Sequence, residues 1–406
     1  MELNQQTSKQ NYYAFLWHAV FLALAVNFMD VETIIPAMMV DAGSSSFQLG
    51  ILTAIMLGGG KFAQLFFAPF LSNRSSKKKY LLDGINARIF SLGAMALLFW
   101  FSTHIADALI IWSIFILIAL FSFGGAFANI SYVDILGKSV FQEKRKVFFS
   151  IKQVISSIVV FLSAFLVRRV LVAYHYPMNY AALFFVAAIL LGIASLGLWR
   201  IREIPASNFK ISGFKNFIDT ILQEIRINKK WRSYLFLTNT QGISIVLMPF
   251  LVLYAKKLFS ADSQDIGNFL VLKVIGGILS GSVLFYFSGK VRYQVMLYVT
   301  TIIAILIPLF ILLLPGPTLF PYVFLLGGIV YTIHTISING ILLEVTTEQN
   351  RALYTGLSGA GSIFPVIFPF LGGWIISEFG FNLFFGLFIT IMIMSIYFIR
   401  GVNCKV

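Results

Sequence analysis

Long apolar runs recur along the whole chain and are separated by short stretches in which Lys and Arg are common. A transmembrane helix needs about 20 apolar residues to cross the hydrocarbon core of a bilayer. The pattern therefore predicts an all-α integral membrane protein with twelve transmembrane helices, at residues 14–40, 47–72, 81–102, 108–136, 148–174, 179–201, 233–257, 265–288, 294–314, 319–343, 353–378 and 382–400. The first run is too long for a signal peptide and has no small-residue cleavage site, which predicts a retained helix.

The two halves of the chain repeat each other in order. Ser46, Gly50, Gly59 and Gly60 recur 217 residues later as Ser263, Gly267, Gly276 and Gly277, and a basic stretch follows both copies. We therefore expect a six-helix bundle at 1–201, a cytoplasmic linker at 202–232 and a second six-helix bundle at 233–406. Paired bundles of this kind are typical of transporters. Apolar residues spaced three and four apart in the linker indicate an amphipathic helix on the membrane surface. A solvated connector that only tethers the two bundles is an equal alternative.

Composition sets the class of protein and its surroundings. With 59% hydrophobic and 11% charged residues and a mean hydropathy of +0.88, the chain has too little polar surface for a water-soluble globule. Lys and Arg concentrate in alternate loops, which places both termini in the cytoplasm. The net charge of +14 is then explained by basic residues in the cytoplasmic loops, where they also attract anionic lipid. It does not indicate nucleic-acid binding.

Cysteine usage and length bear on cofactors and compartment. The single cysteine, Cys404, excludes an internal disulfide, and no residue cluster indicates a metal or cofactor site. The lack of extracellular cysteine pairs and the compact length predict a bacterial inner membrane. We expect the protein to act as a monomer.

The loop after the second predicted helix carries a family motif. Its sequence from Pro69 to Lys78 resembles the loop pattern of the major facilitator superfamily: Leu71, Arg74, Lys77 and Lys78 match, while Pro69, Asn73 and Ser76 replace Gly, Asp and Gly. The resemblance covers essentially the whole chain and implies two six-helix bundles in twelve helices. In such transporters this loop latches the two halves at the cytoplasmic side. We accordingly expect a cytoplasmic gate of charged and polar residues: Asn73, Arg74, Lys77, Asp134, Arg145, Glu344 and Arg351.

Charged residues inside predicted helices are the sharper signal, because an unpaired charge in the bilayer is costly and functional use is the default hypothesis. On a continuous helix, at about 100° per residue, Asn27 and Asp30 share a face and Glu32 points elsewhere. Asp30 is then either a proton-carrying or cation-binding acid or the partner of Lys61 in a structural ion pair. Lys273 either pairs with Asp30 or Glu32 or attracts an anionic substrate group.

Neutral polar residues complete the expected cavity. The family resemblance implies that helices 1, 4, 7 and 10 line the path, and the last three of these supply Asn129, Tyr132, Thr238, Gln241, Tyr331, His334 and Thr335. His334 could titrate near neutrality or serve as a neutral hydrogen-bond partner. Arg88 and Lys152 are interpreted as side chains that snorkel toward the membrane surface or pair at the gate.

These observations predict a secondary active transporter for a small organic solute, coupled to protons and working by alternating access. Its partners would be the solute, H⁺ and the lipid bilayer. An uncoupled facilitator is the alternative within transport. A membrane-embedded sensor or enzyme is disfavoured, because the chain has no phosphate-binding loop, nucleophile elbow or metal-ligand cluster. We therefore do not expect an enzyme.

Overall fold

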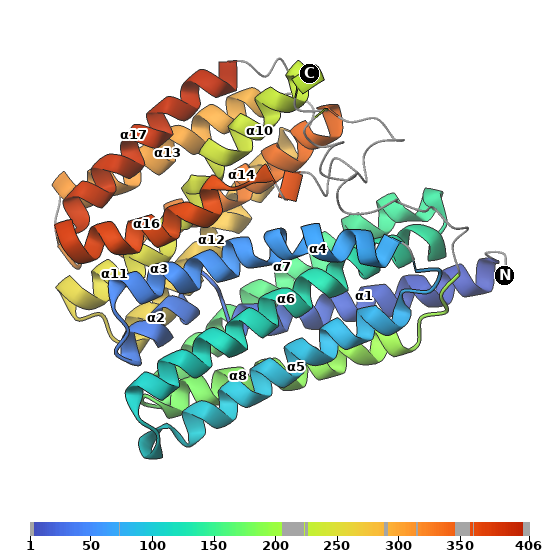
Figure 1. The fold of residues 1–406 in the computed structure, drawn as a ribbon, viewed down its shortest axis with the longest axis horizontal. Helices are drawn as coiled ribbons and strands as arrows, with labels where there is room; N and C mark the ends of the chain where they lie inside the picture. The colour runs from blue at the N-terminus through green and yellow to red at the C-terminus, as the bar shows by residue number, and fades with distance from the viewer. Residues whose placement is uncertain are drawn as a thin grey trace. The chain divides into compact units, whose positions relative to one another are not determined.

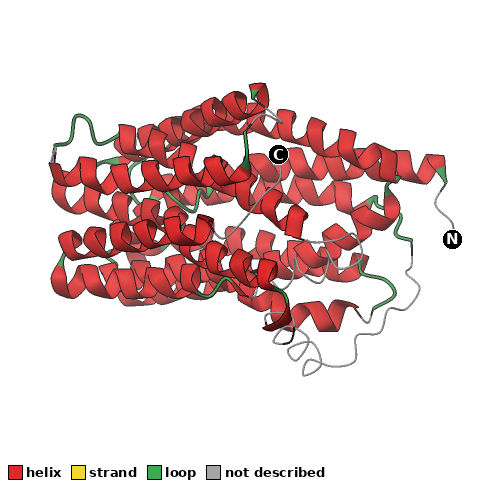
Figure 2. Cartoon of the chain, turned by 90° about the horizontal axis from the view of Figure 1, so that it is seen from above, coloured by secondary structure: helices red, strands yellow, loops and turns green. Residues whose placement is uncertain are grey.

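The computed structural model describes residues 4–72, 74–204, 223, 226–287, 291–313, 316–345, 358–359 and 361–400. Within these ranges every regular element is a helix (Figure 2). The α-helices, labelled in Figure 1, are α1 (Gln5–Phe28), α2 (Ile34–Asp41), α3 (Ser46–Ala54), α4 (Gly60–Ser72), α5 (Lys78–Trp100), α6 (Asp107–Ser139), α7 (Gln142–Ala173), α8 (Met178–Trp199), α10 (Lys229–Gln241), α11 (Leu247–Phe259), α12 (Ser263–Tyr286), α13 (Tyr293–Leu313), α14 (Tyr322–Val345), α16 (Phe364–Phe379) and α17 (Phe381–Arg400). Short π or 3-10 segments are η1 (Ile55–Gly59), η2 (Ser102–His104) and η3 (Gly242–Val246).

The all-helical prediction is confirmed. Ten stretches of the described chain are long and apolar enough to cross a membrane, and two shorter apolar helices, Ser46–Gly59 and Phe364–Phe379, overlap two further predicted spans. Twelve spans and cytoplasmic termini stay predictions. The linker helix expected between Phe214 and Ile225 lies outside the described residues.

The chain divides into two compact units. The first consists of residues 1–30 and 59–217, and the second of residues 31–58 and 218–406. In the first unit α5 packs against α6 and α8, and α1 packs against α7 and α8. In the second, α12 packs against α14, α13 against α14 and α17, and α3 against α16. The predicted halves at 1–201 and 233–406 differ from these units chiefly in residues 31–58.

The first predicted span, 14–40, is not one helix. Residues 29–33 form turns between α1 and α2. Pro36 is the third residue of α2, and a proline in a continuous helix would clash with the carbonyl four residues earlier, that of Glu32. The expectation that Asn27, Asp30 and Glu32 lie on one continuous helix was therefore wrong, because Asp30 and Glu32 lie in the interruption.

The seventh predicted span is interrupted in a similar way. The 3-10 segment η3 separates α10 from α11, and Pro249 is the third residue of α11. The opening helix of each predicted half thus changes its geometry just before a proline. The second predicted span contains the π segment η1 directly before Gly60, and such segments are frequent at functional sites.

Glycines bring helix backbones together within each unit. A Cβ on Gly84 in α5 would lie 2.6 Å from the carbonyl oxygen of Gly124 in α6. In the second unit, a Cβ on Gly50 in α3 would overlap the Pro369 carbonyl of α16. Close backbone approach of this kind is a main source of helix association in lipid. The glycines therefore set helix separations that larger residues could not keep.

Candidate functional site

A polar cavity lies inside the first unit, between α1, α5, α6 and α7. Its volume is about 120 Å³. Five of its lining residues are polar or charged, and the rest are small or apolar: His18, Arg88, Asn129, Tyr132 and Lys152, with Ala19, Leu22, Leu81, Ile85, Gly125 and Ala128. We call these eleven residues the cationic pocket, because they include an arginine and a lysine and no carboxylate.

Arg88 lies midway along α5, and the neighbouring helix α6 shapes its position. The close crossing at Gly84 and Gly124 brings the two helices together one turn before Arg88. Its guanidinium carbon then lies 4.2 Å from the centroid of the Phe121 ring, in cation–π contact. A Cβ on Gly125 would lie 3.6 Å from Arg88 Nε. The Nε atom is enclosed and has no hydrogen-bond partner among the described residues.

His18 on α1 and Tyr132 on α6 both line the cationic pocket. His18 is 2% exposed, and its Nδ1 donates to the Ala194 carbonyl of α8 at 3.3 Å. The Tyr132 ring packs 5.7 Å from the His18 ring and edge-on to Phe15 at 5.0 Å. These contacts hold both rings in place, since each is in contact with a second, well-packed helix.

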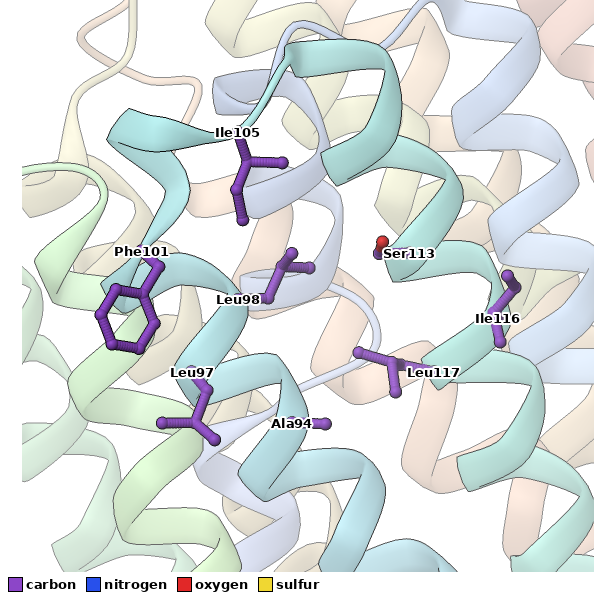
Figure 3. A pocket seen from close by; sticks show the side chains of 8 residues that line it. All are labelled: Ala94, Leu97, Leu98, Phe101, Ile105, Ser113, Ile116 and Leu117. Carbon is purple, nitrogen blue, oxygen red and sulfur yellow. The ribbon is translucent and has the colours of Figure 1, made fainter.

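A larger hollow lies elsewhere in the first unit, between the ends of α5 and α6. Figure 3 shows its side chains: Ala94, Leu97 and Leu98 from α5, Phe101 and Ile105 from the connection, and Ser113, Ile116 and Leu117 from α6. Its volume is about 390 Å³, and it is an open groove rather than a closed cavity. With one hydroxyl among eight side chains it lacks the groups that orient a polar solute.

The sequence-predicted residues of the first unit occupy different places. Asn129 and Tyr132 line the cationic pocket. Asn27 is instead engaged by α7, because its amide donates to the Val160 carbonyl at 3.0 Å and to Ser163 Oγ at 2.8 Å. Asp30 follows α1 in the helix interruption and is partly exposed. Lys61 is the second residue of α4, just after the π segment.

In the second unit Glu32 and Lys273 form an ion pair. Glu32 Oε2 lies 3.0 Å from Lys273 Nζ, and the two side chains are 5% and 13% exposed. The structure therefore selects one of the two alternatives for Lys273, pairing with a carboxylate. Near the start of α3, Lys256 pairs with Asp41 at 2.6 Å and Lys257 donates to Ser46 Oγ at 2.8 Å.

The other predicted residues of the second unit do not gather in a described pocket. Gln241 is fully buried and donates to Thr301 Oγ1 at 2.6 Å and Ser395 Oγ at 2.9 Å, which ties α10 to α13 and α17. Thr238 is buried and donates to the Leu235 carbonyl of its own helix. On α14, His334 is buried, whereas Tyr331 and Thr335 are exposed.

Part of the predicted gate is assembled at one end of the first unit. Asp134 accepts from Lys77 at 3.0 Å and from Lys138 at 2.5 Å. The Arg74 guanidinium lies over the Phe70 ring at 4.7 Å. Asn73, Arg351 and the side chains of Arg145 and Glu344 lie outside the described part of the structure.

A carboxylate that the sequence did not single out organises the same end. Glu203 accepts from Ser76 Oγ at 2.5 Å and from the backbone amides of Lys77 and Lys78 at 2.5 and 2.9 Å. Lys78 Nζ in turn donates to the Trp199 and Ile201 carbonyls at 2.7 and 2.8 Å. The start of α5 and the end of α8 thus satisfy each other's free backbone groups.

Sequence reasoning missed three residues of the cationic pocket: His18, Arg88 and Lys152. Arg88 and Lys152 were interpreted as snorkelling or gate residues, yet both line an internal cavity. The signal that could have found Arg88 was its position midway along an apolar span, where snorkelling to the surface is hardest. No three His, Cys, Asp or Glu side chains gather as a metal site would require among the described residues.

Comparisons with known proteins agree with this architecture. The family model of the Major Facilitator Superfamily matches residues 16–361. The solved structure of a mutant of the nucleoside transporter NupG is similar, with a TM-score of 0.70, 13% identity and coverage of 97% of this chain and 100% of that one. A POT family transporter in complex with a thioalcohol-conjugated peptide gives a TM-score of 0.68 at 11% identity, covering 96% and 94%.

A third solved structure, a bacterial homologue of the human lysosomal transporter Spinster, gives a TM-score of 0.61 at 11% identity, covering 98% and 95%. No curated protein matches in a sequence search. The fold and the family match define an integral membrane protein of the transporter class. The chain belongs to the Major Facilitator Superfamily.

Proposed function

We propose that this protein is a secondary active transporter that moves a small organic solute by alternating access between its two units. The observation that carries the proposal is the cationic pocket, a group of polar and charged side chains inside a unit of largely apolar helices. Ionisable residues inside membrane spans mark solute pathways by default. Asn129 and Tyr132 are its solute contacts, while Thr238, Gln241, Tyr331, His334 and Thr335 are further candidates in the second unit.

We further propose that transport is coupled to protons through Asp30. This carboxylate lies in the non-helical stretch between α1 and α2, and interrupted helices hold coupling-ion sites in many transporters. Lys61 is the candidate ion-pair partner of Asp30, and protonation of the Asp30 carboxylate would break this pair. Lys77, Asp134 and Arg74 serve as the cytoplasmic gate, with Asn73, Arg145, Glu344 and Arg351.

We also propose that the transporter resides in a bacterial inner membrane, as a monomer with both termini in the cytoplasm. None of these features is needed to explain the pocket. The cytoplasmic termini are inferred from the distribution of Lys and Arg, and the bacterial inner membrane from the cysteine content and the compact length.

The experiment has two stages. Thermal-shift screening of the purified full-length protein against a metabolite panel finds binders, because a ligand of the native state raises its apparent stability. Uptake of a radiolabelled binder into proteoliposomes is then measured with and without an imposed pH gradient. We expect the gradient to accelerate uptake in wild type and not in Asp30→Asn, while the exposed-carboxylate control Asp83→Asn behaves as wild type.

Three outcomes separate the alternatives. Uptake that ignores the gradient and a protonophore in wild type identifies an uncoupled facilitator. Uptake that keeps its gradient dependence in Asp30→Asn contradicts the role of Asp30. Binding without uptake of any hit, in either direction of loading, contradicts transport itself and favours a sensor.

A further inference from the structure

The cationic pocket has a charge that its own residues do not balance. Arg88 and Lys152 both line it, no carboxylate is among its eleven lining residues, and neither cation forms an ion pair within the described ranges. A cation in the interior of a membrane protein is costly unless a counter-charge is near. We propose that the pocket binds the anionic head group, carboxylate or phosphate, of an organic anion and that this anion is the transported solute. This inference rests on the proposed transport function.

The donors of the pocket are suited to an oxyanion. Arg88 packs on the Phe121 ring, and its enclosed Nε has no described acceptor. A buried donor left without an acceptor is unfavourable, and an ionised acceptor forms the stronger type of hydrogen bond. Tyr132 and Asn129 add a hydroxyl and an amide to the lining of the pocket. Guanidinium, ammonium, hydroxyl and amide N–H groups all donate, and oxyanions accept.

The size of the pocket limits what it holds. Its volume of about 120 Å³ equals that of about four water molecules at ~30 Å³ each. A carboxylate or phosphate group fits this space, whereas the remainder of a larger solute does not. The pocket therefore recognises the charged end of the solute.

The charged groups near the pocket do not supply the missing negative charge. Asp83, on the same helix as Arg88, is exposed and does not line the cavity. His18 donates from Nδ1 to the Ala194 carbonyl, and an imidazole is neutral or cationic, so it supplies no negative charge. Lys273, the other cation considered for an anionic group, is already paired with Glu32 in the second unit. Arg88 and Lys152 are therefore better candidates than Lys273 for binding a solute anion.

The test uses matched pairs of small solutes at one fixed pH. Organic acids are compared with their neutral amides, and phosphate esters with their parent alcohols, with acetate and inorganic phosphate as head groups alone. The readout is the concentration dependence of the apparent melting temperature of the purified full-length protein. We expect anions to raise it and their neutral counterparts not to. Whether acids or phosphate esters respond identifies the head group.

Variants assign the effect to the pocket. Arg88→Gln and Lys152→Gln should each weaken binding about 10-fold or more, the loss typical of one charge-assisted hydrogen bond. Arg169→Gln and Lys144→Gln remove the same charges from exposed positions on α7 and should leave the affinity unchanged. If Arg88→Gln does not fold, Lys152→Gln still removes one of the two positive charges, and Arg88→Lys tests the guanidinium geometry with the charge kept.

The inference and the proposed function fail in different ways. A neutral solute that binds, is transported and is unaffected by Arg88→Gln leaves transport standing and overturns the anion site. A panel in which no anion raises the melting temperature overturns it as well. An anion that binds through Arg88 and Lys152 but is not transported supports the site and contradicts transport.

Discussion

Glu32 and Lys273 stand 3.0 Å apart, carboxylate oxygen to ammonium nitrogen, with only 5% and 13% of their side chains exposed. Glu32 belongs to the first half of the sequence, yet it packs with α12 because residues 31–58 are part of the second compact unit. The pair neutralises both charges in an apolar setting. It also removes Lys273 from the cations that could attract a solute anion.

Breaking this pair on one side should destabilise the protein more than removing it whole. Lys273→Met leaves the Glu32 carboxylate buried without its counter-charge, which costs about 3–5 kcal/mol in buried pairs. The double variant Glu32→Gln with Lys273→Met leaves no charge and should lie close to wild type. Thermal unfolding in detergent measures the difference, with the exposed Lys230→Met as control. Equal losses of thermal stability in the single and double variants would show that the two side chains stabilise the protein by packing and not by their charges.

Gln241 should tolerate an apolar substitute better than an acidic one. Thr301 and Ser395 use their hydroxyl hydrogens on the Leu297 and Met392 carbonyls, so both offer only lone pairs to Gln241. Gln241→Glu replaces the donating amide by a carboxylate and places acceptors against acceptors. Gln241→Met removes the hydrogen bonds but adds no charge.

We expect Gln241→Met to lower the free energy of unfolding by about 1–2 kcal/mol and Gln241→Glu to lower it by more. The melting temperatures at neutral pH rank the two variants. A melting temperature of Gln241→Glu at or above that of Gln241→Met would contradict the assignment of donors.

Gly50→Ala should separate α3 from α16. The new Cβ would overlap the Pro369 carbonyl and lie 3.1 Å from the Gly373 Cα, and backbone atoms cannot move aside as a flexible side chain can. Overpacking at tight sites costs about 1–3 kcal/mol. Gly386→Ala in α17 is the matched control, since nothing lies within 4 Å of its Cβ. Thermal stability should fall for Gly50→Ala and stay level or rise for Gly386→Ala. Equal behaviour of the two variants would rule out close packing at Gly50.

Glu203→Gln should loosen the start of α5. The carboxylate accepts from two backbone amides there, and its negative charge favours the helix N-terminus, a combination worth about 1 kcal/mol. Hydrogen exchange of the amides of Lys77 and Lys78 should accelerate in Glu203→Gln. The neighbouring exposed residue provides the control Arg202→Gln, which should exchange as wild type does. Unchanged exchange in Glu203→Gln would mean that water replaces the carboxylate without loss.

The candidate site could be predicted only in part. Asn129 and Tyr132 lie on the expected helix and do line the cationic pocket, because helix periodicity places residues three apart on one side. Gln241 and Asn27 satisfy the same sequence criterion, a polar residue in an apolar span, yet both are bound to neighbouring helices. A polar side chain that bonds to a neighbouring helix cannot be distinguished in the sequence from one that contacts solute. The difference depends on how each helix is rotated about its own axis.

Hydropathy along the chain was enough to predict a helical integral membrane protein, but it did not predict the interruptions of the first and seventh spans. Apolar runs of membrane-spanning length are suited to a lipid environment. A proline in the sequence does not by itself locate an interruption, because Pro308 and Pro369 lie inside helices whereas Pro36 and Pro249 follow interrupted stretches. Only the tertiary structure decided which charges are paired. Glu32 meets Lys273 while Arg88 and Lys152 share a cavity without a carboxylate. Such pairings depend on distances between segments far apart in the chain, and short-range patterns contain no information about those distances.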